Sequence, residues 1–359
     1  MVSRNAVPEA DDEVASGEDD FGIHGRKNPG DPGMSGLKID NITIGGNTYV
    51  IQGNGFPNTN GSGDSAWNVG ISIKYVAYPV ITNCHINQND GVPYSENTIG
   101  IELKQVYNPA ISKCFVKGTW TYGIYHYGIA SHTTAAGDWE DGSISGTFLV
   151  GNQKGLTVEH RKFEAFPGPN PIFVEPGYKV DGCHMNCFEY DMYFKNHRQI
   201  KIYGCHLYSG NRASNYDASL NPSSIIRLGQ VSDVLISGTI FGAPGYYIDD
   251  DNATRSIWIE GQYAQHILIS GCQFNASGVG IYNESSGHKR LDGTTDAGQN
   301  IVAVNNIFYG RGVGNIDQSF GPHVKFVDTT GGLNVIDNWA WNPDPNLSEQ
   351  FRPEADPFA

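Results

Sequence analysis

The chain has 359 residues, of which 45 are glycine, 17% are charged and 11% are aromatic. This composition is too apolar and aromatic for a disordered chain and too rich in glycine for a helical protein, which favours an all-β fold with many turns. The net charge of −15 argues against nucleic acid and anionic membranes as partners, because both are bound through clustered Lys and Arg.

Residues 1–35 show no strand pattern. An acidic stretch at residues 9–20 is followed by a segment rich in Gly and Pro. We interpret residues 1–35 as either a disordered tail or an attachment arm that becomes ordered on a partner. The first twenty residues lack the apolar centre of a secretory signal, and no run in the chain is apolar and long enough to span a membrane. We therefore expect the protein to assemble in the cytoplasm.

An eight-residue signature then recurs along most of the chain: apolar, any, apolar, any, a small or turn residue, Cys/Asn/Thr, any, apolar. Successive copies begin 22 to 42 residues apart, a spacing typical of solenoid proteins. The ten copies are LKIDNITI (37–44), PVITNCHI (79–86), PAISKCFV (109–116), GSISGTFL (142–149), YKVDGCHM (178–185), IKIYGCHL (200–207), VLISGTIF (234–241), ILISGCQF (267–274), IVAVNNIF (301–308) and LNVIDNWA (333–340).

A second strand signal precedes many copies, a Gly followed by alternating apolar residues, as in GISIK (70–74), GIELK (100–104), GLTVE (155–159) and GIYNE (280–284). Each repeat therefore holds at least two short strands that bury their inward side chains only by stacking on neighbouring repeats. We predict an all-β chain: a single right-handed parallel β-helix of about ten or more rungs over residues 36–341. The Pro-rich residues 342–359 are expected to form an extended tail.

Five of the six cysteines occupy the sixth position of the signature: Cys84, Cys114, Cys183, Cys205 and Cys272. The other copies have Ile42, Thr147, Thr239, Asn306 and Asn338 there. In a stacked solenoid this column is an interior ladder of small side chains about 4.8 Å apart. Disulfides, or a metal site at the C-x3-C formed with Cys187, are alternatives, but spacing by whole repeats favours free buried thiols. We predict neither a metal nor a cofactor.

The strand GIELK and turns such as ITNCHI resemble the parallel β-helix repeats of the pectin-lyase-like superfamily, particularly those of bacteriophage tailspikes. The resemblance extends over residues 37–341 and is specific for the fold. It implies a homotrimer that binds bacterial surface polysaccharide, or cleaves it by glycoside hydrolysis or β-elimination. The chain departs from the tailspike pattern because it shows neither a large head-binding domain before the repeats nor a β-sandwich after them. Catalysis is therefore left open.

Side chains alternate between the faces of a strand, so one column of the first strand should point outward in every repeat. Aromatic rings and an Arg along this column suit a polysaccharide that lies along the stack. The alternatives are an interface with another subunit, or merely the strand preference of aromatic residues. The column contains Ser72, Glu102, Tyr125, Thr157, Tyr193, Arg227, Trp258 and Tyr282. The predicted substrate-binding residues are Tyr125, Trp139, Tyr193, Arg227 and Trp258.

Glycoside hydrolysis needs two carboxyl groups that flank the scissile bond. Glu102 and Glu159 stand on strands two rungs apart, and an insertion between them carries further acids and aromatic residues. We predict Glu102, Asp138, Glu140 and Glu159 as the catalytic group, with one general acid and one general base. Each of them can equally be a solvated loop acid. In a lyase the base would instead be a Tyr, His or Lys, with Arg227 or Lys104 neutralising a uronate.

The favoured function is a virion surface spike that binds bacterial surface polysaccharide, with depolymerisation left open. Other virion proteins would hold the spike through the N-terminal arm. The first alternative is a non-catalytic virion component, either a receptor-binding spike or a decoration protein of the capsid or tail. A cellular polysaccharide lyase or hydrolase is a further alternative, against which the missing export signal counts.

Overall fold

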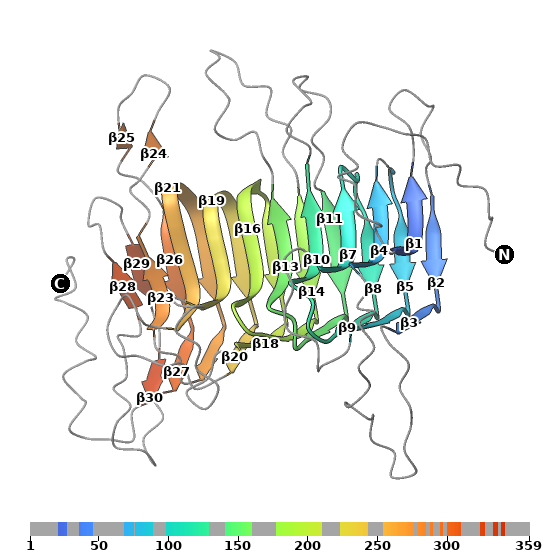
Figure 1. Ribbon diagram of the computed structural model, residues 1–359. Coiled ribbons are helices and arrows are strands. Elements are labelled where there is room, and N and C mark those ends of the chain that lie inside the picture. Colours follow the sequence, from blue (N-terminus) through green and yellow to red (C-terminus); the bar gives the residue numbers. More distant parts are fainter. Residues whose placement is uncertain are drawn as a thin grey trace, which may run out of the picture.

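A computed structural model describes residues 21–26, 36–45, 68–74, 76–88, 98–128, 141–159, 177–209, 223–242, 254–275, 279–284, 288–289, 295–296, 300–309, 324–326, 333–336 and 339–341. All the regular elements in these ranges are β-strands, and the ranges contain no helix of the length and apolarity needed to cross a membrane. The strands stack one after another into an elongated body (Figure 1). The all-β parallel solenoid predicted from the signature is therefore confirmed.

The body contains an 18-stranded sheet, a ten-stranded sheet and a short antiparallel pair, β24 (His288–Lys289) with β25 (Thr295–Asp296). Every other pairing between strands is parallel. Two rows of strands make up the 18-stranded sheet. The first row comprises β1 (Phe21–Arg26), β4 (Val69–Lys74), β7 (Ile99–Lys104), β10 (Tyr122–Tyr127), β13 (Lys154–Glu159), β16 (Tyr190–Arg198), β19 (Ser224–Ser237), β21 (Arg255–Ser270), β23 (Val279–Asn283) and β28 (Val324–Phe326).

The second row holds the opening residues of most signature copies, and the long strands β19 and β21 run through both rows. Its remaining strands are β2 (Lys38–Asp40), β5 (Val80–Thr82), β8 (Ala110–Ser112), β11 (Gly142–Ser145), β14 (Tyr178–Asp181), β17 (Ile200–Tyr203), β26 (Ile301–Val304) and β29 (Leu333–Ile336). The ten-stranded sheet comprises β3 (Thr43–Gly45), β6 (His85–Asn87), β9 (Phe115–Lys117), β12 (Phe148–Val150), β15 (His184–Cys187), β18 (His206–Ser209), β20 (Ile240–Gly242), β22 (Gln273–Asn275), β27 (Ile307–Tyr309) and β30 (Trp339–Trp341).

The ten copies of the signature pair in the register that their alignment predicts, and each supplies one strand to the ten-stranded sheet. The residue at the eighth position of every copy is the direct partner of the eighth residue in the next copy. These partners are, in order, Ile44, Ile86, Val116, Leu149, Met185, Leu207, Phe241, Phe274, Phe308 and Ala340.

The fifth position of the signature is a left-handed turn. Nine copies have a φ of 52° to 60° there, which explains why the position takes Gly or Asn in all but one of them. Glycine adopts this conformation without steric cost and Asn tolerates it, whereas for most other L-residues the left-handed conformation costs about 1–2 kcal/mol. The residues are Asn41, Asn83, Lys113, Gly146, Gly182, Gly204, Gly238, Gly271 and Asn305.

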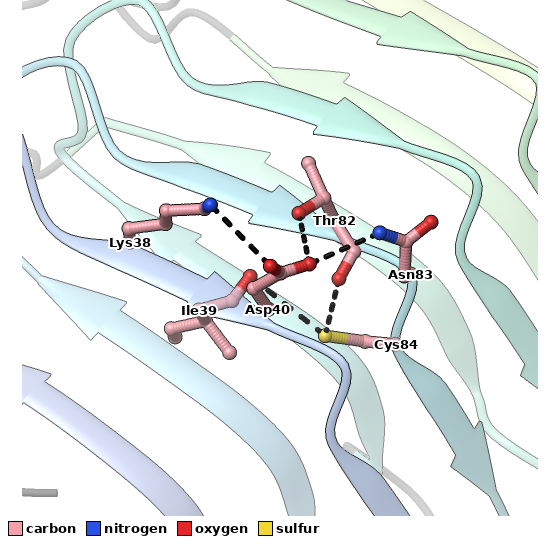
Figure 2. A network of polar contacts seen from close by, with 6 residues as sticks. All are labelled: Lys38, Ile39, Asp40, Thr82, Asn83 and Cys84. Atoms are coloured by element: carbon pink, nitrogen blue, oxygen red, sulfur yellow. Dashed lines mark hydrogen bonds and ion pairs between the residues drawn. The ribbon is translucent and has the colours of Figure 1, made fainter. Parts of the chain in front are cut away.

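The sixth position is the interior ladder of small side chains that the signature predicts, and its buried Cys, Thr and Asn members also donate hydrogen bonds. The Cys84 thiol donates to the carbonyl of Thr82, two residues earlier, at 3.2 Å, and lies 3.9 Å from the carbonyl of Ile39 in the preceding copy (Figure 2). The same pair of contacts recurs further along the stack at Cys272. In the ninth copy, Asn306 donates from its amide nitrogen Nδ2 to the carbonyl of Ile269 at 3.0 Å. All six cysteines are free and buried.

The same turn ties the first two copies together through Asp40. Its carboxylate Oδ1 accepts from Thr82 Oγ1 at 2.7 Å and from Asn83 Nδ2 at 3.0 Å, and Lys38 Nζ lies 3.3 Å from Oδ2 (Figure 2). These contacts lower the pKa of Asp40, with the Thr82 hydrogen bond as the largest cause. The side chains are exposed, so the stabilisation is small.

Strand β1 lies within the segment that we predicted to be an arm without strands. Its sequence FGIHGR pairs with β4 and sets Ile23 beside Ile71, so the sheet begins before the expected boundary at residue 36. The segment contains the Gly-Ile start of the other first-row strands, but a long insertion separates it from the next one. Residues 1–20 and the tail at 342–359 lie outside the described residues.

The interior is one continuous hydrophobic cluster that runs along the stack. Inward residues of the first row, such as Ile71, Ile101 and Leu103, are fully buried. Towards the C-terminal end, the rings of Phe241, Phe274 and Phe308 stack with centroids 4.7 and 4.5 Å apart and planes within 8° of parallel. Such stacking holds successive repeats in register.

Candidate functional site

The residues predicted to form one outward column lie side by side on neighbouring strands of the first row. The eight residues are successive cross-strand partners from β4 to β23, in the order Ser72, Glu102, Tyr125, Thr157, Tyr193, Arg227, Trp258 and Tyr282. We call these residues the outer column. They stand on the face of the first row opposite the apolar interior.

The outer column is less exposed than an outward-facing column was expected to be. Only Tyr125, Tyr193 and Arg227 are partly exposed, whereas the other five members are buried. Neighbouring strands are about 4.8 Å apart, so long side chains cover the short ones beside them. Ser72, for example, is fully buried and lies beside the carboxylate of Glu102.

Strand β10 carries three tyrosines whose rings stack along the strand. The centroids of Tyr122 and Tyr125 are 4.5 Å apart with planes at 11°, and those of Tyr125 and Tyr127 are 4.3 Å apart with planes at 22°. All three side chains are partly exposed. Of the three, only Tyr125 is a site residue predicted from the sequence, because the outer column takes one residue from each strand.

The carboxylate of Glu102 is held by three donors. Ser72 Oγ and Tyr127 OH each donate to it at 2.6 Å, and Lys74 Nζ lies 3.4 Å from Oε2. The side chain is buried. Both carboxylate oxygens are therefore engaged by residues of the protein itself.

Glu159 is held in a similar way by donors from other strands. Tyr125 OH donates to Oε2 at 3.1 Å, and Lys195 Nζ lies 2.9 Å from Oε1. The strands of the two acids are two spacings apart, roughly 9.6 Å, with β10 between them. The acids are also offset by two residues along the strands, because Glu102 is in register with Tyr125 and Glu159 with Tyr127. The tyrosines of β10 reach out in opposite directions, Tyr125 to Glu159 and Tyr127 to Glu102. Aromatic rings, and not an open gap, therefore lie between the two predicted catalytic acids.

Arg227 lies at the centre of a second cluster. Its guanidinium makes a bidentate pair with Glu260, with Nε to Oε1 and Nη2 to Oε2 both at 2.8 Å. It also lies 5.0 Å from the ring centroid of Tyr193 and 4.3 Å from that of Trp258. Glu260 was missed by sequence reasoning, although it follows two residues after Trp258 on the outward side of β21.

Tyr193 completes this cluster as a hydrogen-bond donor. Its hydroxyl donates to Glu260 Oε1 at 3.0 Å. Burial raises the pKa of Tyr193, so the hydroxyl stays protonated and keeps donating at neutral pH. Further along, the guanidinium of Arg255 lies 4.1 Å from the ring centroid of Trp258 and 3.9 Å from that of Tyr282. Rings and cations thus alternate along this end of the outer column.

Three predicted site residues, Asp138, Trp139 and Glu140, lie outside the described residues. Their neighbour Asp141 directly precedes β11 in the second row and accepts a hydrogen bond from the backbone N–H of Gly177. Burial raises the pKa of Asp141. Within the described ranges, His, Cys, Asp and Glu side chains form no group of three that would bind a metal ion.

Comparison with known proteins shows a likeness of fold. No family model matches the chain, and no curated protein matches it in sequence. A solved structure, the N-terminal fragment of gene product 12 of bacteriophage Phi29, superposes with a TM-score of 0.53 over 88% of this chain, at 14% sequence identity. The match covers 47% of the Phi29 chain, so this chain spans about half the length of that protein fragment. The two chains share a fold.

Proposed function

We propose that this chain is the β-helical body of a bacteriophage surface spike that binds bacterial surface polysaccharide. The fold it shares with a bacteriophage gene product supports the assignment to a virion. The observation that carries the binding function is the outer face of the first row. There the three stacked tyrosines of β10 and the Tyr193–Arg227–Trp258 cluster lie along one line of strands.

The chemistry of this face suits a sugar chain. Aromatic rings offer apolar surface to the C–H faces of a pyranose, while their hydroxyls and the adjacent carboxylates exchange hydrogen bonds with sugar hydroxyls. The rings of Tyr122, Tyr125 and Tyr127 cover one another's faces in the stack, so this part of β10 offers a ligand their partly exposed edges and hydroxyls. Tyr193 and Arg227 continue the line two and three strands further along. A ligand that follows the stack would contact both clusters.

The contacts of the acids favour binding over cleavage. Glu102 and Glu159 are both engaged by hydroxyl and ammonium groups, and Tyr125 and Tyr127 lie between them. A glycosidic bond would have to displace these tyrosines to come between the two carboxylates. Depolymerisation therefore stays a prediction, as do the catalytic roles of Asp138 and Glu140.

We further infer a single right-handed coil of about ten rungs. Nearly all crossovers between parallel strands of one sheet are right-handed. The ten strands of the ten-stranded sheet, one from each copy of the signature, support the count. Membership of the pectin-lyase-like superfamily stays a prediction that the stacked parallel sheets support.

The same proposal places the chain in the virion as a homotrimer. Assembly would occur in the cytoplasm of the host, and residues 1–35 would attach the spike to other virion proteins. The acidic stretch at residues 9–20 suits a basic surface on such a partner. Mixing residues 1–20, the part of this segment before strand β1, as a labelled peptide with purified virion proteins would test the attachment.

The binding function is tested with capsular polysaccharide and lipopolysaccharide purified from a panel of bacterial strains. Wild-type protein should bind at least one of them, and Tyr125→Ala should weaken that binding about tenfold through loss of a stacking ring. Lys201→Ala is the control, because Lys201 is exposed on β17 in the second row. If no polysaccharide binds, or if both variants bind like the wild type, the proposal fails.

The same mixtures decide between binding and cleavage. Release of new reducing ends would indicate a hydrolase, and ultraviolet absorbance from an unsaturated product would indicate a lyase. Glu102→Gln and Glu159→Gln should leave binding within a few-fold of the wild type. If either product forms with the wild type and disappears in these variants, the spike is an enzyme and Glu102 or Glu159 is catalytic.

A further inference from the structure

A second line of rings runs along a different face of the body. The seventh position of five successive signature copies is aromatic or His, on the outer face of the ten-stranded sheet. Neighbouring rings have centroids 5.9, 6.0, 5.4 and 6.4 Å apart. We call this set the ring ladder, and its members are His85, Phe115, Phe148, His184 and His206.

The ring ladder is open to solvent. The side chain of Phe148 is 45% exposed, His85 and His206 are exposed, and Phe115 and His184 are partly exposed. The residues that follow them, such as Val116 and Leu149, are fully buried and point inward. A single exposed Phe is ordinary on a protein surface, but a continuous row of five rings marks an interaction site.

The face around the ring ladder is almost without charge. The ten strands of this sheet contain no Asp or Glu, and Lys117 is their one charged residue, in a chain with 38 acidic and 23 basic residues. The first row, by contrast, carries Glu102, Glu159 and Glu260 on its outer face. Depletion of charge together with enrichment of aromatic residues is the compositional signature of the core of a protein–protein interface.

We propose that the outer face of the ten-stranded sheet, centred on the ring ladder, is the surface through which copies of this chain associate side by side. A chain with a net charge of −15 repels its own copies, and this repulsion is weakest between surfaces that carry no acidic residues. This face meets that condition over its described strands. The proposal names the face of the expected homotrimer and does not depend on polysaccharide binding.

The shape of the surface fits contact between copies. The ladder follows the stack, and nine strand steps of about 4.8 Å give the sheet a length of roughly 43 Å. Copies related by a symmetry axis parallel to the stack would place identical strips against one another.

The first test introduces one negative charge on the ladder and measures association by light scattering and sedimentation at neutral pH. Wild-type protein should be an oligomer, and Phe148→Asp should weaken its association at least about tenfold. Ser145→Asp is the matched control, since Ser145 is exposed in the same repeat but belongs to the second row. It should associate like the wild type.

The outcomes separate clearly. A monomeric wild type, or a Phe148→Asp protein that associates normally, overturns the proposal, and so does an equal loss in both variants. Circular dichroism and urea unfolding show whether Phe148→Asp is folded, and His206→Asp replaces it if it is not. Polysaccharide binding by monomeric Phe148→Asp is measured in parallel, so failure of the interface and failure of the binding function are distinguished.

A second test uses the absence of exposed thiols among the six native cysteines. Phe148→Cys places one accessible thiol on the ladder, and mild oxidation with oxidised glutathione should join two copies through these thiols. The glutathione disulfide is reduced to two glutathione thiols as the new disulfide forms. Ser145→Cys should stay uncrosslinked at the same concentration. Equal crosslinking of the two variants would contradict the proposed interface.

Discussion

Asp191 is a carboxylic acid enclosed in the interior, where burial disfavours its charged form. Its Oδ1 accepts from the backbone N–H of Cys187 at 2.8 Å, while Oδ2 has no hydrogen-bond partner among the described residues. Burial raises the pKa of Asp191 well above its usual value. The position is glycine in the four preceding repeats, as at Gly155, whose missing side chain leaves room for the backbone of Asp191.

Asp191→Asn should stabilise the protein at neutral pH. Above pH 3.8 the carboxyl of the unfolded chain loses its proton while the folded one keeps it, so stability falls as pH rises. The loss is about 1.4 kcal/mol per pH unit until the folded pKa is reached. Urea unfolding of both proteins from pH 4 to pH 8 measures the difference, which should grow with pH. A constant difference would mean that Asp191 is ionised in the folded state.

His126 should make the fold sensitive to acid. Its Nε2 lies 2.9 Å from the carbonyl of Val106, and burial lowers its pKa from 6.5 to about 3. Below pH 6.5 the imidazole of His126 binds a proton in the unfolded chain but stays neutral in the folded protein. The free energy of unfolding therefore falls towards pH 3, by about 1.4 kcal/mol per pH unit. His126→Gln keeps a donor near Val106 but cannot titrate. Its unfolding free energy should depend less on pH between 6 and 4, and an unchanged slope would refute this assignment.

At the scale of the strand, the glycine at the second position of β7 is a packing requirement. A Cβ on Gly100 would lie 2.5 Å from Val116 Cγ1 and 2.6 Å from the carbonyl oxygen of Gly123. Both contacts are far inside van der Waals distance, and the second is to backbone. The glycine therefore lets the first row approach the ten-stranded sheet and the next repeat.

Gly100→Ala should destabilise the protein by about 1–3 kcal/mol through overpacking. Gly45→Ala is the control, because nothing lies within 4 Å of the Cβ that it would add to strand β3. Its effect should be within about 0.5 kcal/mol of zero. Thermal and urea unfolding of the two variants give the comparison. Equal effects would show that the crowding at Gly100 is relieved by a backbone shift.

Much of the fold could be predicted from the sequence because its requirements are local. The left-handed turn at Gly204 and the donor at Cys205 follow from the chemistry of neighbouring positions, so the copies could be aligned without knowledge of the structure. The residues on the outer face of the first row could be predicted from the sequence, but the contacts between their side chains could not. The bonds from Tyr127 to Glu102 and from Tyr193 to Glu260 join residues 25 and 67 positions apart, and they depend on which way long side chains lean.

For the whole molecule, two faces of one solenoid have opposite compositions. The first row pairs its carboxylates with tyrosines and cations, as at Glu159 and Glu260, so its charges are internally compensated. The ten-stranded sheet instead presents rings without carboxylates. A spike that associates through the second face leaves the first free to contact a ligand, which makes the two proposals compatible in one assembly.

The solenoid should also open from its ends. Each repeat contacts mainly the repeats on either side of it, so the stability of the stack is approximately a sum over repeats and the interfaces between them. A terminal repeat has a neighbour on one side only and therefore opens more easily. The six buried cysteines report on this directly, because a thiol reagent reaches them only when a repeat opens. Cys84 belongs to the second signature copy, whereas Cys183 belongs to the fifth.

Cys84 should be modified at least about tenfold faster than Cys183 under native conditions, which corresponds to about 1.4 kcal/mol between their opening free energies. Pulse labelling with a thiol-reactive reagent, followed by mass spectrometry of peptides, gives the rate at each site. Rates in strong denaturant provide the control, because both thiols are then equally accessible. Equal native rates would show that the stack opens as one cooperative unit, and that contacts beyond neighbouring repeats hold its ends.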